Sequence, residues 1–361
     1  MNIADIDENL RINPTLDLPD VQWLDASEAP FRVYGAADPK VSFDRVPPDV
    51  AAVSAKYWGL GEGIRSLAQN TAGVRLRFAT DSPYIAISAK WRNQTQMPHM
   101  AFTGISGFDL YSCKEGVQNF VNSFCPPVNA PHGYDSKVDT LNGGVLTDYV
   151  LNFPLYNDVV TLAVGIQKGA TLTAGTETYR LNELPVLFYG SSITQGGCAS
   201  RPGTCYQGFV SRALNLNYIN FGFSGSAKGE PPMTEYMASL PMSAFVCDYD
   251  HNAPDADFLN KTHYEVYRTV REKNPAVPIV LISRPNRGSA EEVKKRRIVV
   301  ADTYRRAVEA GDKQVCFIDG GSFFKGMAGD SCNVDGCHPT DLGFYFMAEG
   351  ITPVLKEVLF K

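Results

Sequence analysis

The 361-residue sequence contains no apolar run of about 18 residues, which is the minimum length of a membrane-spanning helix. Residues 1–8 also lack the basic start and the following apolar stretch of a secretory signal. We therefore expect no membrane partner. We expect a cytoplasmic protein, or a secreted one if a signal has been removed from the chain.

The sequence also lacks an excess of positive charge, because 33 Lys and Arg stand against 39 Asp and Glu and the formal net charge is −6. A negative surface repels phosphate backbones, so we expect no nucleic-acid partner. The strongest basic run, at residues 294–297, falls in a stretch with a helical pattern. We interpret it as a solvated helix face.

Eight cysteines in a chain of this length, without a visible signal, are expected to be mostly free thiols. Two pairs are close enough in the sequence to form disulfides, Cys198 with Cys205 and Cys332 with Cys337, and the redox compartment decides whether they do. A metal site on Cys332, Cys337 and His338 is a weaker alternative, because no second ligand cluster accompanies it. We expect no metal and no organic cofactor.

The length favours two domains, and the sequence pattern changes near residue 179. Before that point, short segments alternate apolar and polar residues between Gly, Pro and Asn turns, and no amphipathic helix is evident over 70–180. These segments are 74–78, 85–89, 149–153 and 159–164. The pattern predicts an all-β sandwich or jelly-roll domain over residues 1–178.

Residues 179–361 instead alternate short apolar strands with helical patterns. Strands are expected at 184–189, 218–221, 244–247, 279–282 and 315–318, and helices at about 206–214, 256–273, 289–310 and 341–358. Apolar strands that alternate with helices are typical of a parallel sheet covered on both faces. The fold class is therefore α/β, with a flavodoxin-like, doubly wound, five-stranded sheet.

Polar clusters follow four of these segments, at the strand ends where α/β sheets bind ligands. The clusters are 190–197, 220–225, 248–252 and 335–339, and they contain serine, histidine, aspartate, asparagine and glycine. Serine becomes a nucleophile when a histidine removes its proton and an acidic residue orients that histidine. Glycine N–H groups and an asparagine amide can stabilise the resulting oxyanion. These residue types together predict acyl transfer.

In this order the four clusters resemble the four sequence blocks of the SGNH/GDSL hydrolase superfamily, over about 180–361. Gly-Ser-Ser-Ile-Thr at 190–194 resembles the Gly-Asp-Ser-(Leu/Ile)-Thr block, which implies that Ser192 is the nucleophile. The closing Asp-x-x-His implies that Asp335 and His338 complete its triad.

The resemblance also implies an oxyanion hole formed by the Ser192 N–H, the Gly225 N–H and the Asn252 amide. The chain departs from the family at two places. Ser191 replaces the Asp of the first block and is a rival nucleophile, although the following Ile-Thr aligns only with Ser192. The third block reads Asp-His-Asn, where the family has Gly-x-Asn-Asp.

Gly-Phe-Asp-Leu-Tyr at 107–111 resembles the Gly-x-Asp-Leu-Tyr motif of the β-sandwich domain that precedes SGNH domains in one group of bacterial esterases. That group is often linked to carbohydrate deacetylation. The resemblance implies a serine esterase for small acyl esters, acetyl above all, on carbohydrate or other small-molecule substrates. The alternatives are a lipid or aryl esterase and a non-catalytic carbohydrate-binding protein on the same scaffold. A homodimer is the base-rate expectation.

Several other residues have simpler interpretations. Asp248 and Asp250 could form a carboxylate pair for glycoside cleavage, but no second cluster supports this. We interpret His251 as a hydrogen-bonded loop residue and His99 as structural. Trp58 is expected in the core of the β domain rather than on a sugar.

Overall fold

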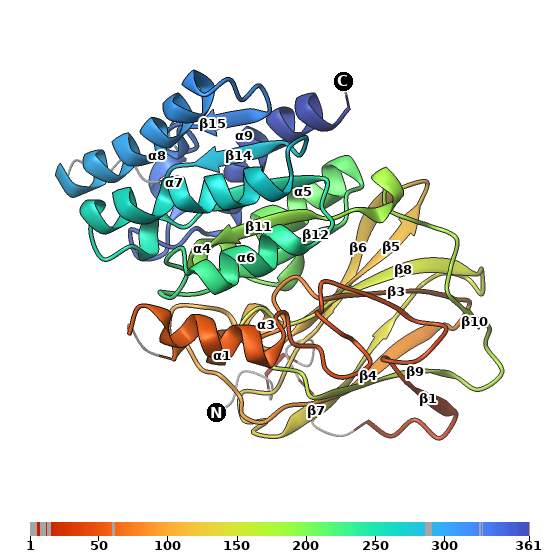
Figure 1. Cartoon of the computed structure of the whole chain (residues 1–361). Coiled ribbons are helices and arrows are strands. Elements are labelled where there is room, and N and C mark those ends of the chain that lie inside the picture. The colour runs from red at the N-terminus through yellow and green to blue at the C-terminus, as the bar shows by residue number, and fades with distance from the viewer. Residues whose placement is uncertain are drawn as a thin grey trace.

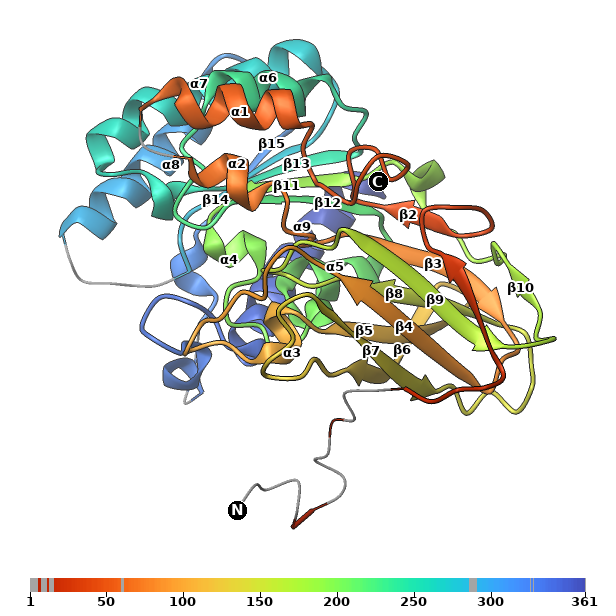
Figure 2. The same ribbon diagram turned by 90° about the horizontal axis from the view of Figure 1, so that it is seen from below.

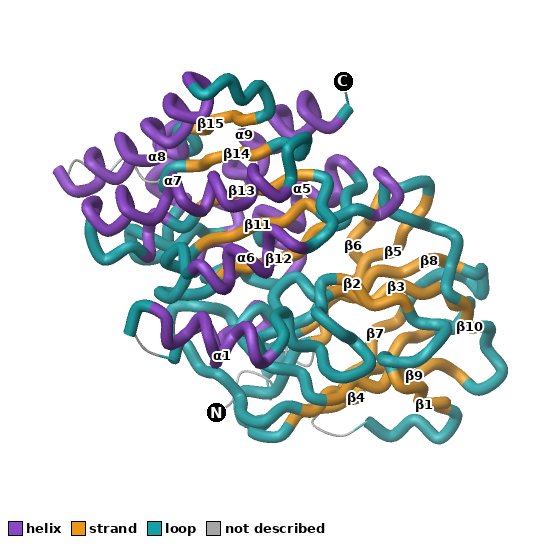
Figure 3. The backbone as a smooth tube through the Cα atoms, in the orientation of Figure 1, coloured by secondary structure: helices purple, strands orange, loops and turns teal. Residues whose placement is uncertain are grey.

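The structure is a computed structural model that describes residues 6, 7, 12, 16–59, 62–285, 291–324, 326 and 328–360. An α/β part and a β-rich part lie side by side (Figure 1). The tube in Figure 3 separates them by element type, with helices concentrated in the first part and strands in the second.

The α/β part contains a five-stranded sheet in the order β12-β11-β13-β14-β15, with every pairing parallel. The strands are β11 Val186–Gly190, β12 Tyr218–Gly222, β13 Ala244–Asp248, β14 Ile279–Ile282 and β15 Val315–Ile318. This is the flavodoxin-like order, which confirms the predicted fold class. The strand order reverses at β11 and β13, so the loops that follow these two strands border the crevice where such sheets bind ligands.

Helices cover both faces of this sheet (Figure 2). One face packs against α5 (Tyr206–Leu214) and α9 (Asp341–Leu359). The other packs against α6 (Pro231–Ser239), α7 (Ala256–Lys273) and α8 (Glu291–Glu309). Of these, α6 was not predicted. It begins with two prolines, which are well tolerated in the first turn of a helix.

The shorter helical segments lie in connections. They are α3 Phe102–Ile105, α4 Ser192–Gln195 and the 3₁₀ segments Leu181–Glu183, Pro202–Thr204, Asp250–Asn252, Gly320–Ser322 and Gly329–Cys332. None of the helices in the described part of the chain is long and apolar enough to cross a bilayer.

The β-rich part consists of two antiparallel sheets. One has the order β1-β9-β4-β7, and the other has the order β10-β3-β8-β5-β6 with β2 on β3. The strands are β1 Val21–Asp25, β2 Arg32–Tyr34, β3 Arg75–Thr80, β4 Tyr84–Lys90, β5 Phe108–Lys114, β6 Val117–Phe124, β7 Gly133–Asp139, β8 Thr147–Asn152, β9 Thr161–Gln167 and β10 Leu172–Thr173. Apolar side chains from both sheets, such as Phe78, Ile87 and Val164, form one core. The predicted β-sandwich is thereby confirmed.

Strand β3 is buried on both faces, although its alternating sequence is typical of a half-exposed strand. Arg75 and Arg77 are each only 1% exposed. The Arg75 guanidinium donates to the Asn217 side-chain oxygen at 2.7 Å and to the Tyr218 carbonyl at 3.0 Å, at the start of β12. It also lies 3.8 Å from the centre of the Tyr218 ring. On the polar face of this strand, Arg75 therefore contacts the α/β part, and Arg77 donates to the Cys113 sulfur of β5 at 3.2 Å rather than facing water.

Two helices interrupt the predicted β domain, α1 (Pro48–Tyr57) and α2 (Gly63–Leu67). Ala51 and Ile64 belong to the core that α6, α7 and α8 form with the sheet. Trp58 follows α1 and packs edge-on against Phe258 of α7, with ring centres 5.3 Å apart. The placement of Trp58 in the sandwich core was therefore wrong. The division at 178/179 remains a prediction, because residues 48–67 pack on the second half.

Two further expectations have outcomes here. All eight cysteines are free thiols, so neither Cys198 with Cys205 nor Cys332 with Cys337 is bridged. The basic run is a solvated face only in part, because Lys294 and Lys295 are exposed whereas Arg296 is 7% exposed. Its guanidinium donates to the carbonyls of Asp250 and Ala253, both at 2.7 Å, and so anchors the loop after β13.

Candidate active site

The turn after β11 presents Ser192 at the carboxyl edge of the sheet. Strand β11 ends at Gly190, and α4 begins at Ser192 and closes at Gly196 in the left-handed region, with φ 105°. A Cβ on Gly190 would lie 2.0 Å from Thr194 Oγ1 and 2.5 Å from the Asp248 carbonyl oxygen. Only glycine fits this close strand–helix junction.

Three predicted residues meet at this point through two hydrogen bonds. Ser192 Oγ lies 2.9 Å from His338 Nε2, and His338 Nδ1 lies 2.7 Å from Asp335 Oδ2. The other Asp335 oxygen accepts from the backbone N–H groups of Cys337, at 3.0 Å, and His338, at 2.8 Å. The Asp-x-x-His spacing therefore forms a tight turn in which the aspartate holds both the backbone and the ring of the histidine.

The charge of Asp335 determines which atom donates and which accepts in these hydrogen bonds. Partial burial opposes ionisation of Asp335, but hydrogen bonds from the His338 backbone and ring and from the Cys337 N–H outweigh it and lower the Asp335 pKa to about 2. The carboxylate is therefore charged at neutral pH and accepts the Nδ1–H of His338. Nε2 is left with a lone pair toward Ser192, and the serine hydroxyl donates to it.

The rival nucleophile has a different environment. Ser191 is fully buried, and its Oγ accepts the backbone N–H of Ile193 at 3.2 Å as the N-cap of α4. Of the two adjacent serines, the structure therefore brings Ser192 to His338 and assigns Ser191 to the helix cap.

The two aspartates considered as a glycosidase pair are completely buried. Asp248 lies beneath the turn that follows β11, where Thr194 Oγ1 donates to it at 3.2 Å. Burial, then the nearby charge of Asp250, raises the Asp248 pKa well above its usual range. Asp250 accepts the Arg284 N–H at 3.0 Å. Neither carboxyl reaches solvent, so both serve the scaffold, and the glycosidase interpretation fails.

The three predicted oxyanion residues lie in the segments that follow β11, β12 and β13. Gly225, with φ 64°, is in the turn after β12, where the left-handed conformation favours glycine. Across residues 16–59, 62–285, 291–324 and 328–360, neither the Ser192 N–H nor the Gly225 N–H forms a hydrogen bond. Asn252 Nδ2 donates to the Phe223 carbonyl at 2.8 Å, so this amide also braces the Gly225 turn.

Sequence reasoning missed Gln195, which connects α4 to the same turn. Its Oε1 accepts the Ser224 N–H at 3.0 Å, and its Nε2 donates to Asn70 Oδ1 at 3.1 Å. The residue is fully buried. Its position in the Ser-x-x-Gln segment was visible in the sequence, but the partner loops that give it a role were not.

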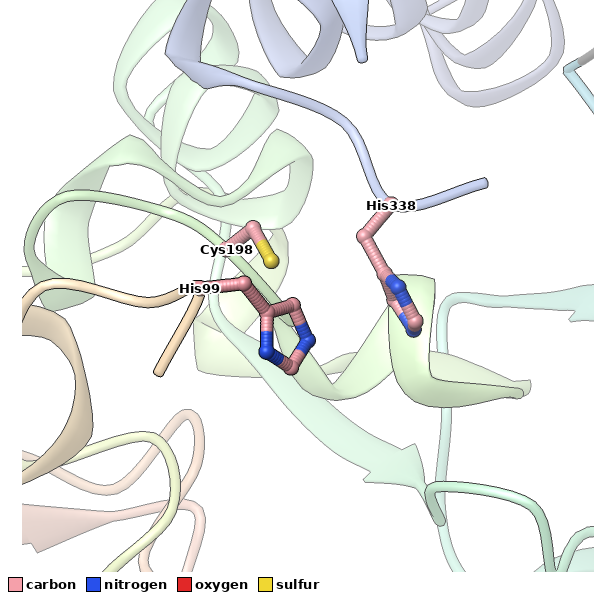
Figure 4. A group of neighbouring side chains, drawn as sticks. All are labelled: His99, Cys198 and His338. Carbon is pink, nitrogen blue, oxygen red and sulfur yellow. The ribbon is translucent and has the colours of Figure 1, made fainter. Parts of the chain in front are cut away.

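His99 was interpreted as structural, but it lies at the site. This residue comes from the β-rich part, and its Nε2 is 4.0 Å from Asp335 Oδ2. Its ring centre is 5.7 Å from that of His338. Figure 4 shows the His99 and His338 rings on either side of a common space, with Cys198 beside them. No local sequence pattern could reveal this, because the contact joins residues far apart in the chain.

His251 is the second histidine near the triad. Its Nδ1 lies 3.7 Å from the Cys337 sulfur. Burial, followed by the positive charges of Arg284 and His338, lowers the His251 pKa well below its usual range, so the ring is neutral. This agrees with its interpretation as a loop residue.

The Gly-x-Asp-Leu-Tyr motif forms hydrogen bonds with the loop that follows α4. Asp109 is fully buried in β5. One of its oxygens accepts from Arg201 and from the Gly203 N–H, both at 2.8 Å, and the other accepts from Asn152 Nδ2 at 2.8 Å. The Tyr111 hydroxyl also accepts from Arg201. The sandwich thereby holds residues 201–203 through an ion pair whose carboxylate is fully buried.

The same loop is held from its other side by the helix that follows the histidine. Asp341, in the first turn of α9, accepts from the Ser200 N–H and from Thr204 Oγ1, both at 2.8 Å. The Ser200 hydroxyl also donates to Asp341. Loop 200–204 therefore couples the sandwich motif to the start of α9, three residues after His338.

Two family profiles match the chain. The GDSL-like lipase/acylhydrolase family matches residues 183–356, and the N-terminal domain of SGNH-hydrolase-type esterases matches residues 21–172. No curated protein sequence is significantly similar to the chain.

Solved structures share the whole two-part architecture. A protein described as a GDSL-like lipase, from Bacteroides ovatus, has TM-score 0.81 and 27% identity, covering 94% of this chain and 98% of its own. A salicylyl-acyltransferase from a tetracycline biosynthetic pathway has TM-score 0.76 and 20% identity, covering 95% and 100%. An acetyl xylan esterase from the rumen bacterium Butyrivibrio proteoclasticus has TM-score 0.59 and 14% identity, covering 94% and 100%.

The likeness to the last two structures shows a shared fold, whereas the two profiles together match most of the chain in the predicted order. The chain therefore combines a domain of the GDSL-like lipase/acylhydrolase family with the N-terminal domain of the SGNH-hydrolase-type esterases, and is a carboxylic ester hydrolase.

Proposed function

We propose that the protein is a serine esterase that removes small acyl groups, acetyl above all, from carbohydrate or other small-molecule esters. The observation that carries the proposal is the hydrogen-bonded series from Ser192 through His338 to Asp335, at 2.9 and 2.7 Å. Nucleophile, base and orienting carboxylate stand in the order that acyl transfer requires.

In the proposed mechanism, Ser192 Oγ attacks the ester carbonyl carbon while its proton moves to His338 Nε2. The carbonyl oxygen becomes an oxyanion that the N–H groups of Ser192 and Gly225 and the Asn252 amide stabilise. The tetrahedral intermediate collapses, and the His338 proton goes to the departing alcohol oxygen. Water then attacks the acyl-enzyme with His338 again as base, and this releases the acid and restores the serine.

One comparison supports a small acyl group. The acetyl xylan esterase with the same fold acts on an acetyl ester of a carbohydrate, as its name states.

The test is hydrolysis of p-nitrophenyl acetate, butyrate and octanoate by the wild type and by Ser192→Ala. We expect acetate to be hydrolysed fastest, and the variant to lose turnover while its circular dichroism spectrum is unchanged. Octanoate preference would favour a lipid or aryl esterase. No turnover on any ester would favour a carbohydrate-binding protein, and full activity in Ser192→Ala would refute the nucleophile.

Acyl transfer to an alcohol is a second candidate, because the likeness to the salicylyl-acyltransferase extends over the whole chain. The acyl-enzyme would be the same, and an acceptor hydroxyl would replace water in the second step. Assays with added glycerol or a monosaccharide distinguish the two: an esterase yields mainly acetate, whereas a transferase yields mainly the acylated acceptor.

A further inference from the structure

A cluster of soft metal ligands lies beside the proposed triad. His99, Cys198 and His338 each offer one ligand atom, and these atoms lie within 4.8 Å of one another. They come from three separate segments: the loop after β4, the loop after α4, and the Asp-x-x-His turn. Figure 4 shows the three side chains directed toward a shared space. In the described part of the chain, this is the group of three histidine, cysteine or acidic side chains whose ligand atoms lie close enough together to hold one metal ion.

We propose that His99, Cys198 and His338 form an inhibitory zinc(II) site. Two imidazole nitrogens and one thiolate are ligands that zinc prefers, and three protein ligands leave the fourth tetrahedral position for water. Ligand atoms around tetrahedral zinc are about 3.3–3.8 Å apart, given bond lengths of about 2.0–2.3 Å. A movement of about 1 Å in the exposed His99 and half-exposed His338 side chains, toward the buried Cys198, closes the cluster.

The surroundings suit the ion in two ways. Asp335 hydrogen-bonds the His338 ring at 2.7 Å and lies 4.0 Å from His99 Nε2, so a carboxylate stands behind the imidazole ligands. Such an outer carboxylate orients metal-binding histidines. The side chains of His99 and His338 are 38% and 23% exposed, so the ion can enter from solvent.

The backbone around Cys198 fixes the position of its side chain beside the two histidines. It adopts φ 72°, a left-handed conformation that is uncommon for a residue with a side chain. Its N–H donates to the Met100 sulfur at 3.3 Å, which connects the Cys198 loop to the residue next to His99. On binding, the thiol loses its proton to solvent and a zinc–sulfur bond forms.

Zinc at this site stops the proposed reaction whichever His338 nitrogen it takes. Nε2 is the nitrogen that receives the Ser192 proton, and Nδ1 is the nitrogen that Asp335 orients. A bond from either one to zinc breaks the triad, so the ion is an inhibitor and not a cofactor. This consequence rests on the proposed function, whereas zinc binding itself does not.

Binding is tested first without any activity measurement. Cobalt(II) replaces zinc in such sites, and a thiolate ligand gives a sulfur-to-cobalt charge-transfer absorption. We expect this absorption in the wild type and its loss in Cys198→Ser. Zinc affinity, measured by competition with a chromogenic chelator, should fall at least about tenfold in His99→Gln. Unchanged absorption and affinity in both variants would overturn the site, whether or not the protein hydrolyses esters.

Inhibition is tested by p-nitrophenyl acetate hydrolysis with and without zinc, each variant being compared with itself. We expect the wild type to be inhibited and reactivated by EDTA, and His99→Gln and Cys198→Ser to need at least about ten times more zinc. Cys337→Ser is the matched control. Cys337 lies on the same Asp-x-x-His turn as His338, but its thiol is outside the cluster, 3.7 Å from His251 Nδ1. Loss of zinc sensitivity in Cys337→Ser, with Cys198→Ser unaffected, would place the ion elsewhere and refute the proposal.

Discussion

Replacing Asp109 with asparagine should destabilise the protein strongly, although Asp109 lies in the sandwich and not at the carboxyl edge of the parallel sheet. The carboxylate is fully buried and accepts three hydrogen bonds, from Arg201, Gly203 and Asn152, each at 2.8 Å. Asparagine keeps the shape of the side chain but has one acceptor oxygen in place of two. At least one buried donor then loses its partner, and the Arg201 cation loses its counter-charge.

The expected loss of unfolding free energy follows from removing one partner of an ion pair whose carboxylate is buried, which costs about 3–5 kcal/mol. With a urea dependence of about 3 kcal/mol per molar for a protein of this size, the unfolding midpoint should fall by roughly 1–2 M. Tryptophan fluorescence reports the transition. Trp23 and Trp91 lie in the sandwich part, and Trp58 packs on α7.

Asp302→Asn is the matched control, because it breaks an ion pair with Arg305, whose side chain is 57% exposed. Exposed pairs contribute about 0–1 kcal/mol, so this midpoint should move little. We also expect Asp109→Asn to lower kcat for p-nitrophenyl acetate at native temperature, because loop 200–204 loses one of its two supports. An unfolding midpoint like that of Asp302→Asn would refute the conclusion that the Gly-x-Asp-Leu-Tyr motif stabilises the contact between the two parts.

Three other predictions follow from individual contacts. Asp335→Asn should lower kcat by about 10⁴-fold with the fold intact, because the His338 tautomer is no longer imposed; a loss below tenfold would contradict that role. Ser191→Ala removes the α4 cap and should lower the unfolding free energy by about 1 kcal/mol, measured in urea, while most activity remains. His263 is buried, and this burial lowers its pKa to about 4, so the folded state resists a proton that the unfolded state accepts. The contribution of the neutral His263 ring to the free energy of unfolding is therefore complete above about pH 6.5 and is lost as the pH falls toward 4. The unfolding midpoint of His263→Gln should therefore depend less on pH over that range, and an unaltered dependence would contradict the assignment.

The α/β half was predictable in order and in type because its signals are local. Strands such as β14, Ile279–Ile282, are short apolar runs since both faces of the sheet are covered, and α7 and α9 carry continuous helical patterns. Where such strands are parallel, the residues that follow them meet at one edge. The convergence of Ser192 with Asp335 and His338 could therefore be predicted without coordinates, although their catalytic roles remain a proposal.

Other features depend on how the two halves pack together. The alternation of β3 indicates a face that is polar, but only the docked structure shows that Arg75 meets the start of β12 rather than water. Helix α1 begins at a proline and packs against α6, a contact that no pattern within residues 48–57 encodes.

The sequence by itself determined the elements of the α/β half apart from α6, their order and the residues at the carboxyl edge, because each depends on short-range periodicity and on the parallel topology. It also favoured Ser192 over Ser191, and the structure places Ser192 against His338. Tertiary structure alone brought His99 and the Asp109 motif from the sandwich to that edge. These are contacts between segments about 100 residues or more apart, and their geometry depends on the packing of the two halves rather than on any local pattern.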